Sequence, residues 1–169
     1  MALNQILRGK TQYPLYGKNG TVLYSTAVSM TCAIVISWTG GSDVDICGFF
    51  SHCPDSQVGW SHGASIDCGD GFTAAWGGDN TSGGPETVDL AYSGNGGIAG
   101  KSFEIHLNWY STGSGSGGPA TVTATDSAGS VKTFTISPSS STHKAATPSN
   151  PGVRINFNNG GTLKSITAA

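Results

Sequence analysis

The sequence predicts an all-β protein built as a two-sheet antiparallel β-sandwich with extended N- and C-terminal strands. Apolar residues alternate with polar ones at a period of two along most of the chain, which is typical of half-buried strands. Clusters of Gly, Asn, Ser and Asp separate these short runs and supply turn residues. The composition agrees, because the chain has 26 glycines, only 11% charged residues and hardly any stretch of good helix formers.

The run over residues 102–110 is the clearest of the predicted strands. Its apolar members Phe103, Ile105, Leu107 and Trp109 should face the core, whereas Glu104, His106, Asn108 and Tyr110 should face outward. Similar runs give eight or nine strands, at a spacing that favours a two-sheet sandwich. The other predicted strands cover residues 21–24, 31–38, 44–50, 87–92, 120–125, 131–136, 153–157 and 163–166.

A length of 169 residues fits one domain. We divide it into an N-terminal arm with the first strands at 1–30, the sandwich core at 31–137 and a last part at 138–169. This last part is a Ser/Thr/Pro-rich crossover followed by a final hairpin of the same domain.

Charge is distributed unevenly, although the formal net charge is only −2. Residues 19–100 contain no Lys or Arg, yet they hold eight of the ten carboxylates of the chain. A folded segment of this kind repels itself unless the carboxylates spread into solvent or share a counter-ion. Exposure on long loops is one interpretation, and a bound metal ion is the other.

Two segments of this acidic region offer the ligands of a hard cation. Asp43-Val44-Asp45 opens a predicted strand, so both carboxylates can face one ion while Val44 enters the core. The glycine-rich loop of residues 77–86 adds carboxylate, amide and backbone carbonyl oxygens. Ca²⁺ takes roughly six to eight oxygen ligands and needs neither His nor Cys. The predicted cofactor is Ca²⁺, and its predicted ligands are Asp43, Asp45, Asp79, Asn80 and Glu86.

At these residues the chain resembles the tellurium-resistance, TerD-type β-sandwich, in which a strand-opening D-x-D precedes a G-D-N-x-T-G-x-G…E loop. The stretch Gly78-Asp79-Asn80-Thr81-Ser82-Gly83 with Glu86 is similar to a shortened version of that loop. The family loop usually continues into several consecutive acids, whereas this chain has Pro85-Glu86 alone. The resemblance implies a calcium-type core, with calcium on the five residues named above and no catalysis.

The chain is also similar to a related family of bacterial sandwich modules, which have a W-x…D-x-D start, a G-P-E segment and a late Tyr-Ser strand end. The matching residues are Trp38 with Asp43-Val44-Asp45, Gly84-Pro85-Glu86 and Trp109-Tyr110-Ser111. Together the two resemblances cover roughly residues 34–136 and leave the arm and the tail unmatched.

The cysteines at positions 32, 47, 53 and 68 match no metal or redox signature. We see no signal peptide or membrane span in the sequence, so buried reduced thiols are the default expectation. Two alternatives remain open, namely disulfides and a Cys₃His zinc site formed by Cys47, Cys53, His62 and Cys68.

Gly59-Trp60-Ser61-His62-Gly63 matches the G-x-S-x-G of serine hydrolases, but the strand-turn-helix elbow is missing, so we expect no enzyme.

The favoured function is a non-enzymatic, calcium-binding β-sandwich that self-assembles as a structural subunit of a phage virion or surface fibre. The basic arm at residues 8–18 could reach a neighbouring copy, giving a homo-oligomer or filament. The expected location is a virion or extracellular particle, or alternatively the cytoplasm.

Two alternative functions remain open. The first alternative is a cytoplasmic, TerD-like calcium module of the stress response. The second is a carbohydrate-binding module that stacks a glycan on Trp60, Trp76 and Tyr92. No nucleic-acid or membrane partner is expected.

Overall fold

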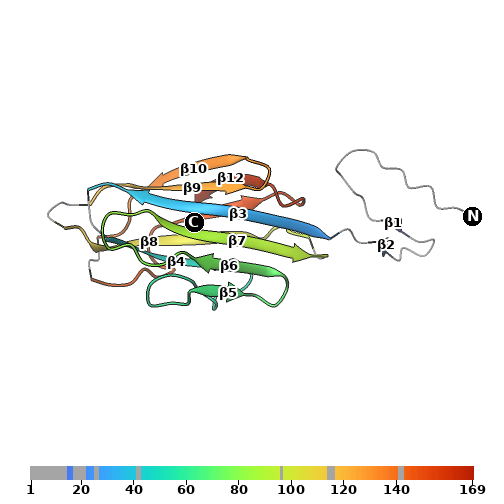
Figure 1. The fold of residues 1–169 in the computed structure, drawn as a ribbon, viewed down its shortest axis with the longest axis horizontal. Helices are drawn as coiled ribbons and strands as arrows, with labels where there is room; N and C mark the ends of the chain where they lie inside the picture. The colour runs from blue at the N-terminus through green and yellow to red at the C-terminus, as the bar shows by residue number, and fades with distance from the viewer. Residues whose placement is uncertain are drawn as a thin grey trace, which may run out of the picture.

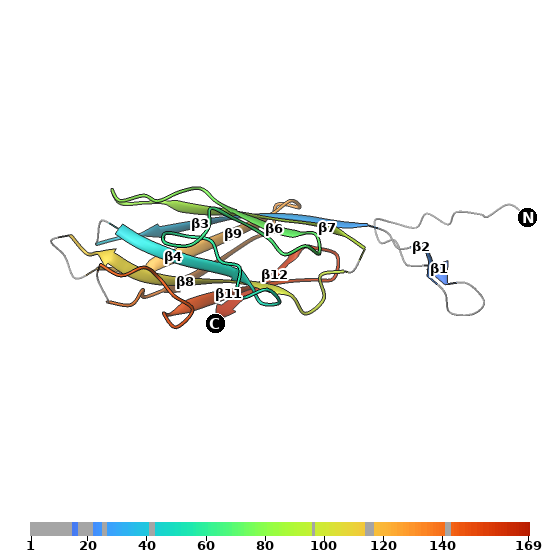
Figure 2. The same ribbon diagram turned by 90° about the horizontal axis from the view of Figure 1, so that it is seen from below.

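Two antiparallel sheets pack face to face in the computed structural model (Figures 1 and 2). The structure describes residues 15–16, 22–24, 27–40, 43–95, 97–113, 117–140 and 143–169. These residues form strands, turns and irregular connections without any helix, which confirms the predicted all-β sandwich. Among them, no helix is long and apolar enough to cross a membrane.

The larger sheet has six strands, and its central strand β3 pairs with β7 on one side and with β9 on the other. Every second residue of β3 is buried, as expected for a strand with one face on the core. In spatial order the strands are β10 (Val131–Ile136), β9 (Ala120–Asp126), β3 (Val28–Trp38), β7 (Glu86–Gly94), β6 (Phe72–Trp76) and β5 (Ser65–Asp67).

The smaller sheet has four strands and includes the strand that begins with Asp43-Val44-Asp45. Its spatial order is β12 (Leu163–Ala168), β11 (Gly152–Phe157), β8 (Ser102–Ser111) and β4 (Asp43–Phe50). Strand β4 is an edge strand of this sheet, yet all of its residues are buried. The loop after β4 folds back on its free edge, where Val58 and Gly48 exchange two backbone hydrogen bonds.

A third, two-stranded sheet consists of β1 (Leu15–Tyr16) and β2 (Val22–Tyr24). Among the strands that the structure describes, these two pair with each other and with no strand of the sandwich. They lie beyond one end of the two main sheets (Figure 2). The rest of the predicted basic arm, residues 8–14 and 17–18, lies outside the described part of the chain.

The core fills the space between the two main sheets with alternate residues of both. Three phenylalanines form its aromatic centre, because the ring of Phe50 lies 5.2 Å from that of Phe72 and 4.9 Å from that of Phe103. Asp126, the last residue of β9, connects the two sheets. Its carboxylate accepts hydrogen bonds from the backbone N–H of Ser130, next to β10 in the larger sheet, and of Leu163, at the start of β12 in the smaller sheet. A buried carboxylate with several backbone donors is well satisfied.

The predicted faces of β8 need one correction. Phe103, Ile105 and Leu107 are buried in the core as expected, but His106 and Asn108 on the opposite face are buried as well. The crossover between β10 and β11 covers this face, where Asn108 donates to the Lys144 carbonyl and His106 contacts the Asn150 carbonyl at 2.7 Å. The predicted alternation of the two faces is confirmed, but the polar face of this strand is covered by the crossover and does not face solvent.

Strands β5 and β6 were not predicted, and β1 was expected only as part of the N-terminal arm with its first strands, without bounds of its own. β1 and β5 contain only two and three residues, too few to show a period. β6 alternates Phe72 and Ala74 inward with Thr73 and Ala75 outward, and small alanines give a weak hydrophobic signal. Together β5 and β6 place Cys68 and Trp76 at opposite ends of a short hairpin in the larger sheet.

Candidate metal centre

Three of the predicted metal ligands meet at one end of the sandwich. Asp43, Asp79 and Glu86 each offer a carboxylate oxygen, and these oxygens all lie within 4.8 Å of one another. Asp43 is the first residue of β4, and Glu86 is the first residue of β7. Asp79 lies in the connection from β6 to β7. The site therefore joins the two sheets through residues that are 43 positions apart in the sequence.

Asp45 lies beside this group, on the same strand as Asp43. It is two residues beyond Asp43 on β4, so the two side chains lie on the same side of the strand, opposite to the core residue Val44. Asp45 is 1% exposed and Asp43 is 5% exposed. The D-x-D prediction is consistent with this placement, because both carboxylates are buried at the same strand end.

Glu86 is held in place by hydrogen bonds from Trp76, the last residue of β6, and from Asn80 in the connection between β6 and β7. The indole N–H of Trp76 donates to Oε2 at 3.0 Å, and the backbone N–H of Asn80 donates to Oε1 at 3.4 Å. No sequence pattern links Trp76 to the acidic site, because this contact depends on β6 ending opposite the start of β7. Both oxygens of Glu86 keep further lone pairs that can take a cation.

Gly84 closes the connection against Trp38. Its φ is +72°, which favours glycine, and a Cβ at this position would come within 2.9 Å of the Trp38 ring. The Gly84–Pro85 peptide bond is cis. The positive φ of Gly84 and its close approach to Trp38 leave little choice of residue at this position, two residues before Glu86.

The Asn80 side chain takes a different role from the predicted one. Its Oδ1 accepts hydrogen bonds from the backbone N–H and the hydroxyl of Ser82, both at 3.1 Å. Its Nδ2 donates to the Pro85 carbonyl at 3.4 Å. Asn80 therefore shapes the loop that carries Asp79, and its side-chain oxygen is occupied within that loop.

The environment of these carboxylates strongly opposes their negative charge. Burial raises the pKa of Asp45 to about 7, and the charges of Asp43 and Asp79 raise it as well. Burial raises the pKa of Glu86 to about 8, although the hydrogen bonds from Trp76 and Asn80 favour the charged form. Burial and then the charge of Asp79 raise the pKa of Asp43. No ion pair of the described residues brings a basic side chain to this group.

Two buried oxygens of this group have no hydrogen-bond partner. They are Oδ1 of Asp43 and Oδ2 of Asp45. Among the described residues, the only other buried side-chain polar atom without a partner is the indole nitrogen of Trp38, whose ring packs on Gly84. Buried polar atoms are nearly always satisfied, and leaving one unpaired costs about 1–3 kcal/mol. These two oxygens point to a cation or a proton as the missing partner.

The predicted Cys₃His zinc set is not brought together. Cys53 and Cys68 form a disulfide, which also replaces the default expectation of reduced thiols at these two positions. Cys47 is fully buried beside Gln57, and Nε2 of His62 lies 2.9 Å from the Ala146 carbonyl. The spacing could not reveal this separation, because Cys47 lies in the middle of β4 and the others lie in loops or after β5.

The three aromatic residues considered for glycan stacking do not form one platform. Tyr92 is 3% exposed and packs on Phe72 in the core. Trp76 donates to Glu86, and Trp60 instead lies against Tyr110 with ring centroids 5.3 Å apart.

Comparison of the chain with protein family models, with curated proteins and with solved structures gave no match.

The raised pKa values predict how the ion-free protein responds to pH. Asp45 and Glu86 bind protons more tightly in the folded state than in the unfolded state, where carboxyls titrate near pH 4. Their contribution to stability is therefore complete below about pH 4 and is lost as the pH rises through about 7 and 8. In EDTA, the free energy of unfolding should fall by several kcal/mol between pH 5 and pH 8.5, measured by urea unfolding.

The Asp45→Asn/Glu86→Gln double variant is the matched control for this titration. It removes both titrating groups and should show a much flatter profile over the same range. A wild-type profile that is flat or rises between pH 5 and pH 8.5 would contradict the buried, unpaired state of these carboxylates.

Proposed function

We propose that this chain is a calcium-stabilised β-sandwich in which Asp43, Asp45, Asp79 and Glu86 supply the side-chain oxygens of one cation site. The observation that carries the proposal is the convergence of three carboxylates within 4.8 Å, without a basic partner among the described residues. At neutral pH such a group must either hold protons or bind a cation. A divalent ion removes the repulsion and satisfies the two orphaned oxygens together.

The donor atoms favour a hard cation and, among these, Ca²⁺. All the converging side-chain donors are carboxylate oxygens, which suit Ca²⁺ and Mg²⁺ rather than the softer metals that prefer His and Cys. Mg²⁺ demands near-ideal octahedral geometry, whereas Ca²⁺ accepts irregular sites and bidentate carboxylates. A site made of two strand ends and one glycine-rich loop is irregular, so it suits Ca²⁺ better.

The proposed role of the ion is structural. β4 belongs to the smaller sheet, whereas the β6–β7 connection and β7 belong to the larger one. An ion on Asp43, Asp79 and Glu86 would therefore hold the two sheets together at this end of the sandwich. The same residues carry the TerD resemblance, so a TerD-like calcium module remains the runner-up for the biological role.

Calcium should raise the melting temperature at pH 7.5 relative to EDTA. A ligand that binds only the folded state stabilises it by about 2.7 kcal/mol at a hundredfold excess over Kd. For a chain of this length that corresponds to roughly 5–10 °C. Differential scanning calorimetry in EDTA, Mg²⁺ and Ca²⁺ measures the shift, which should be largest with Ca²⁺.

Two variants separate ion binding from general charge effects. Glu86→Gln should lose the calcium shift and yet melt higher than wild type in EDTA above pH 8, because one repelling charge is gone. Asp55→Asn, which neutralises an exposed acid of the same segment, should keep the full calcium shift. Equal wild-type midpoints in EDTA and in Ca²⁺ would refute the calcium site.

We also propose that the protein assembles with copies of itself as a repeated structural subunit. A two-stranded sheet such as β1–β2 is marginally stable alone, and it pairs with no described strand of its own sandwich. The free edge of β4 is covered, but β10 is an exposed edge strand on which Val131 is 55% exposed. An open edge of this kind accepts an extra strand through main-chain hydrogen bonds.

Deleting residues 1–16 should release a soluble monomer that still melts cooperatively, because β1 is removed and the sandwich is left intact. Multi-angle light scattering on both forms measures the change. Val131→Lys should weaken assembly of the full-length chain, since charge on an edge strand opposes strand addition. Thr73→Lys, an exposed site on the interior strand β6, is its control. A full-length chain that is monomeric at high concentration would refute the assembly role.

A further inference from the structure

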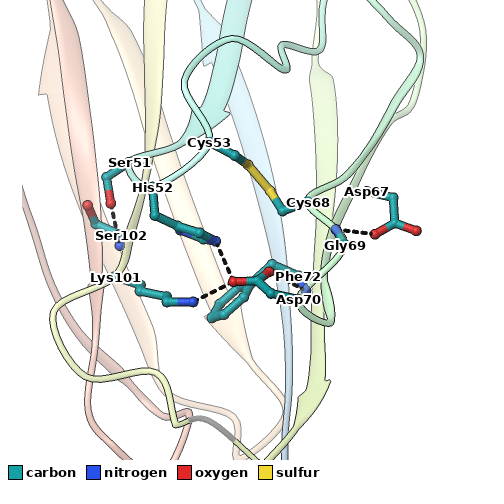
Figure 3. Close-up of polar contacts among 10 residues, drawn as sticks. All are labelled: Ser51, His52, Cys53, Asp67, Cys68, Gly69, Asp70, Phe72, Lys101 and Ser102. Atoms are coloured by element: carbon teal, nitrogen blue, oxygen red, sulfur yellow. Dashed lines mark hydrogen bonds and ion pairs between the residues drawn. A yellow bond between two sulfur atoms is a disulfide. The ribbon is translucent and has the colours of Figure 1, made fainter.

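A second group of metal-ligating side chains lies at the far end of β4. His52 and Cys53 follow β4, and Cys68 follows β5 in the other sheet. One ring nitrogen of His52 and the two sulfurs all lie within 4.8 Å of one another. The loop after β4 and the β5–β6 turn bring them together, with Asp70 in the same turn (Figure 3).

The backbone holds both cysteines in place independently of their disulfide. The N–H of Cys53 donates to the Phe50 carbonyl, and the N–H of Cys68 donates to the Phe72 carbonyl, both at 3.0 Å. Phe50 and Phe72 are fully buried core residues. Reduction of the disulfide would therefore leave the two sulfurs close together rather than free to separate.

His52 is oriented by an outer carboxylate. Its Nε2 lies 3.1 Å from Oδ2 of Asp70, and its ring packs on Phe72 with centroids 4.8 Å apart. Asp70 is itself fixed by Lys101, whose ammonium group lies 2.5 Å from the same oxygen (Figure 3). Metal-binding histidines commonly donate their second ring N–H to a carboxylate in this way, which leaves the other ring nitrogen free for the metal.

We propose that His52, Cys53 and Cys68 form a zinc site that exists only when the disulfide is reduced. A dithiol reductant gives two electrons and two protons to the disulfide and becomes a disulfide itself. Zn²⁺ then binds the two sulfurs as thiolates and Nδ1 of His52, which releases the two thiol protons. Water completes the tetrahedron, and Nε2–H of His52 stays on Asp70.

The chemistry of the group suits zinc. Zn²⁺ is bound by Cys sulfur at about 2.3 Å and by His nitrogen at about 2.0–2.1 Å. After reduction the two sulfurs would move apart until both reach the ion, and the His52 nitrogen within 4.8 Å of both lies close enough to share it. Asp67 and Asp70 add negative charge nearby, and within the described part of the chain Lys101 is the only Lys or Arg that forms an ion pair with this group. The His52 side chain is 23% exposed and both cysteines are only partly buried, so both reductant and metal can enter.

The site would exchange one connection between the sheets for another. The oxidised chain joins the end of β4 to the β5–β6 hairpin by a covalent bond, whereas the reduced chain would join them through zinc. It is separate from the acidic site, because the two lie at opposite ends of β4, about 20 Å apart along the strand.

Cobalt substitution tests this proposal directly. The full-length chain, with the acidic site saturated by Ca²⁺, is titrated with Co²⁺ in its oxidised form and after reduction with a phosphine. The reduced chain should bind one Co²⁺ with a thiolate-to-cobalt absorption band and the intense visible bands of tetrahedral coordination, and Zn²⁺ should displace it. The oxidised chain should show neither band.

Three variants assign the ligands. Cys53→Ser/Cys68→Ser, which keeps Cys32 and Cys47, should lose the thiolate band. His52→Gln, which keeps the disulfide and whose fold can be checked in the oxidised form, should weaken Co²⁺ binding by at least about tenfold. His143→Gln, at a histidine outside the group, should bind like wild type. A reduced wild type without a thiolate band, or a His52→Gln variant that binds as tightly as His143→Gln, would overturn the zinc site.

Discussion

The burial of several carboxylates without a basic partner is the constraint on which the rest of this structure depends. Asp43, Asp45 and Glu86 are almost inaccessible to solvent, and among the described residues no Lys or Arg forms an ion pair with them. Burying an isolated charge is so costly that the group must be neutralised, by protons or by an ion. Folding is therefore linked to protonation or to cation binding, because the two sheets close over these side chains only when their charge is neutralised.

This constraint explains features of the loop between β6 and β7 that have no other evident purpose. Asn80 uses its side chain to shape the loop, Gly84 lets it pass across Trp38, and Trp76 orients Glu86. At the opposite end of β4 the disulfide between Cys53 and Cys68 joins the same two sheets. β4 is hydrogen-bonded to β8 along its whole length, and it has a cluster of carboxylates at one end and a disulfide at the other.

Much of the fold could be predicted because the pattern of β3, β7 and β8 alternates over nine or more residues. The carboxylates of the acidic site could also be predicted, since the D-x-D pattern and the glycine-rich loop are local. Three features depended on contacts distant in the sequence: the burial of Asn108 under the crossover, the Trp76 hydrogen bond to Glu86 and the pairing of Cys53 with Cys68. No spacing rule describes them, because they depend on which strands pair, on the path of the crossover between β10 and β11 and, for the disulfide, on how the two sheets stack.

The contact between Trp76 and Glu86 also provides the most direct test of the cation site. Tb³⁺ replaces Ca²⁺ at oxygen sites, and it luminesces when a nearby excited indole transfers energy to it. With Trp76 hydrogen-bonded to a proposed ligand at 3.0 Å, excitation of tryptophan should produce Tb³⁺ emission that Ca²⁺ displaces and that Glu86→Gln greatly weakens. If tryptophan excitation gave no Tb³⁺ emission that Ca²⁺ can displace, the acidic group would not be a calcium site.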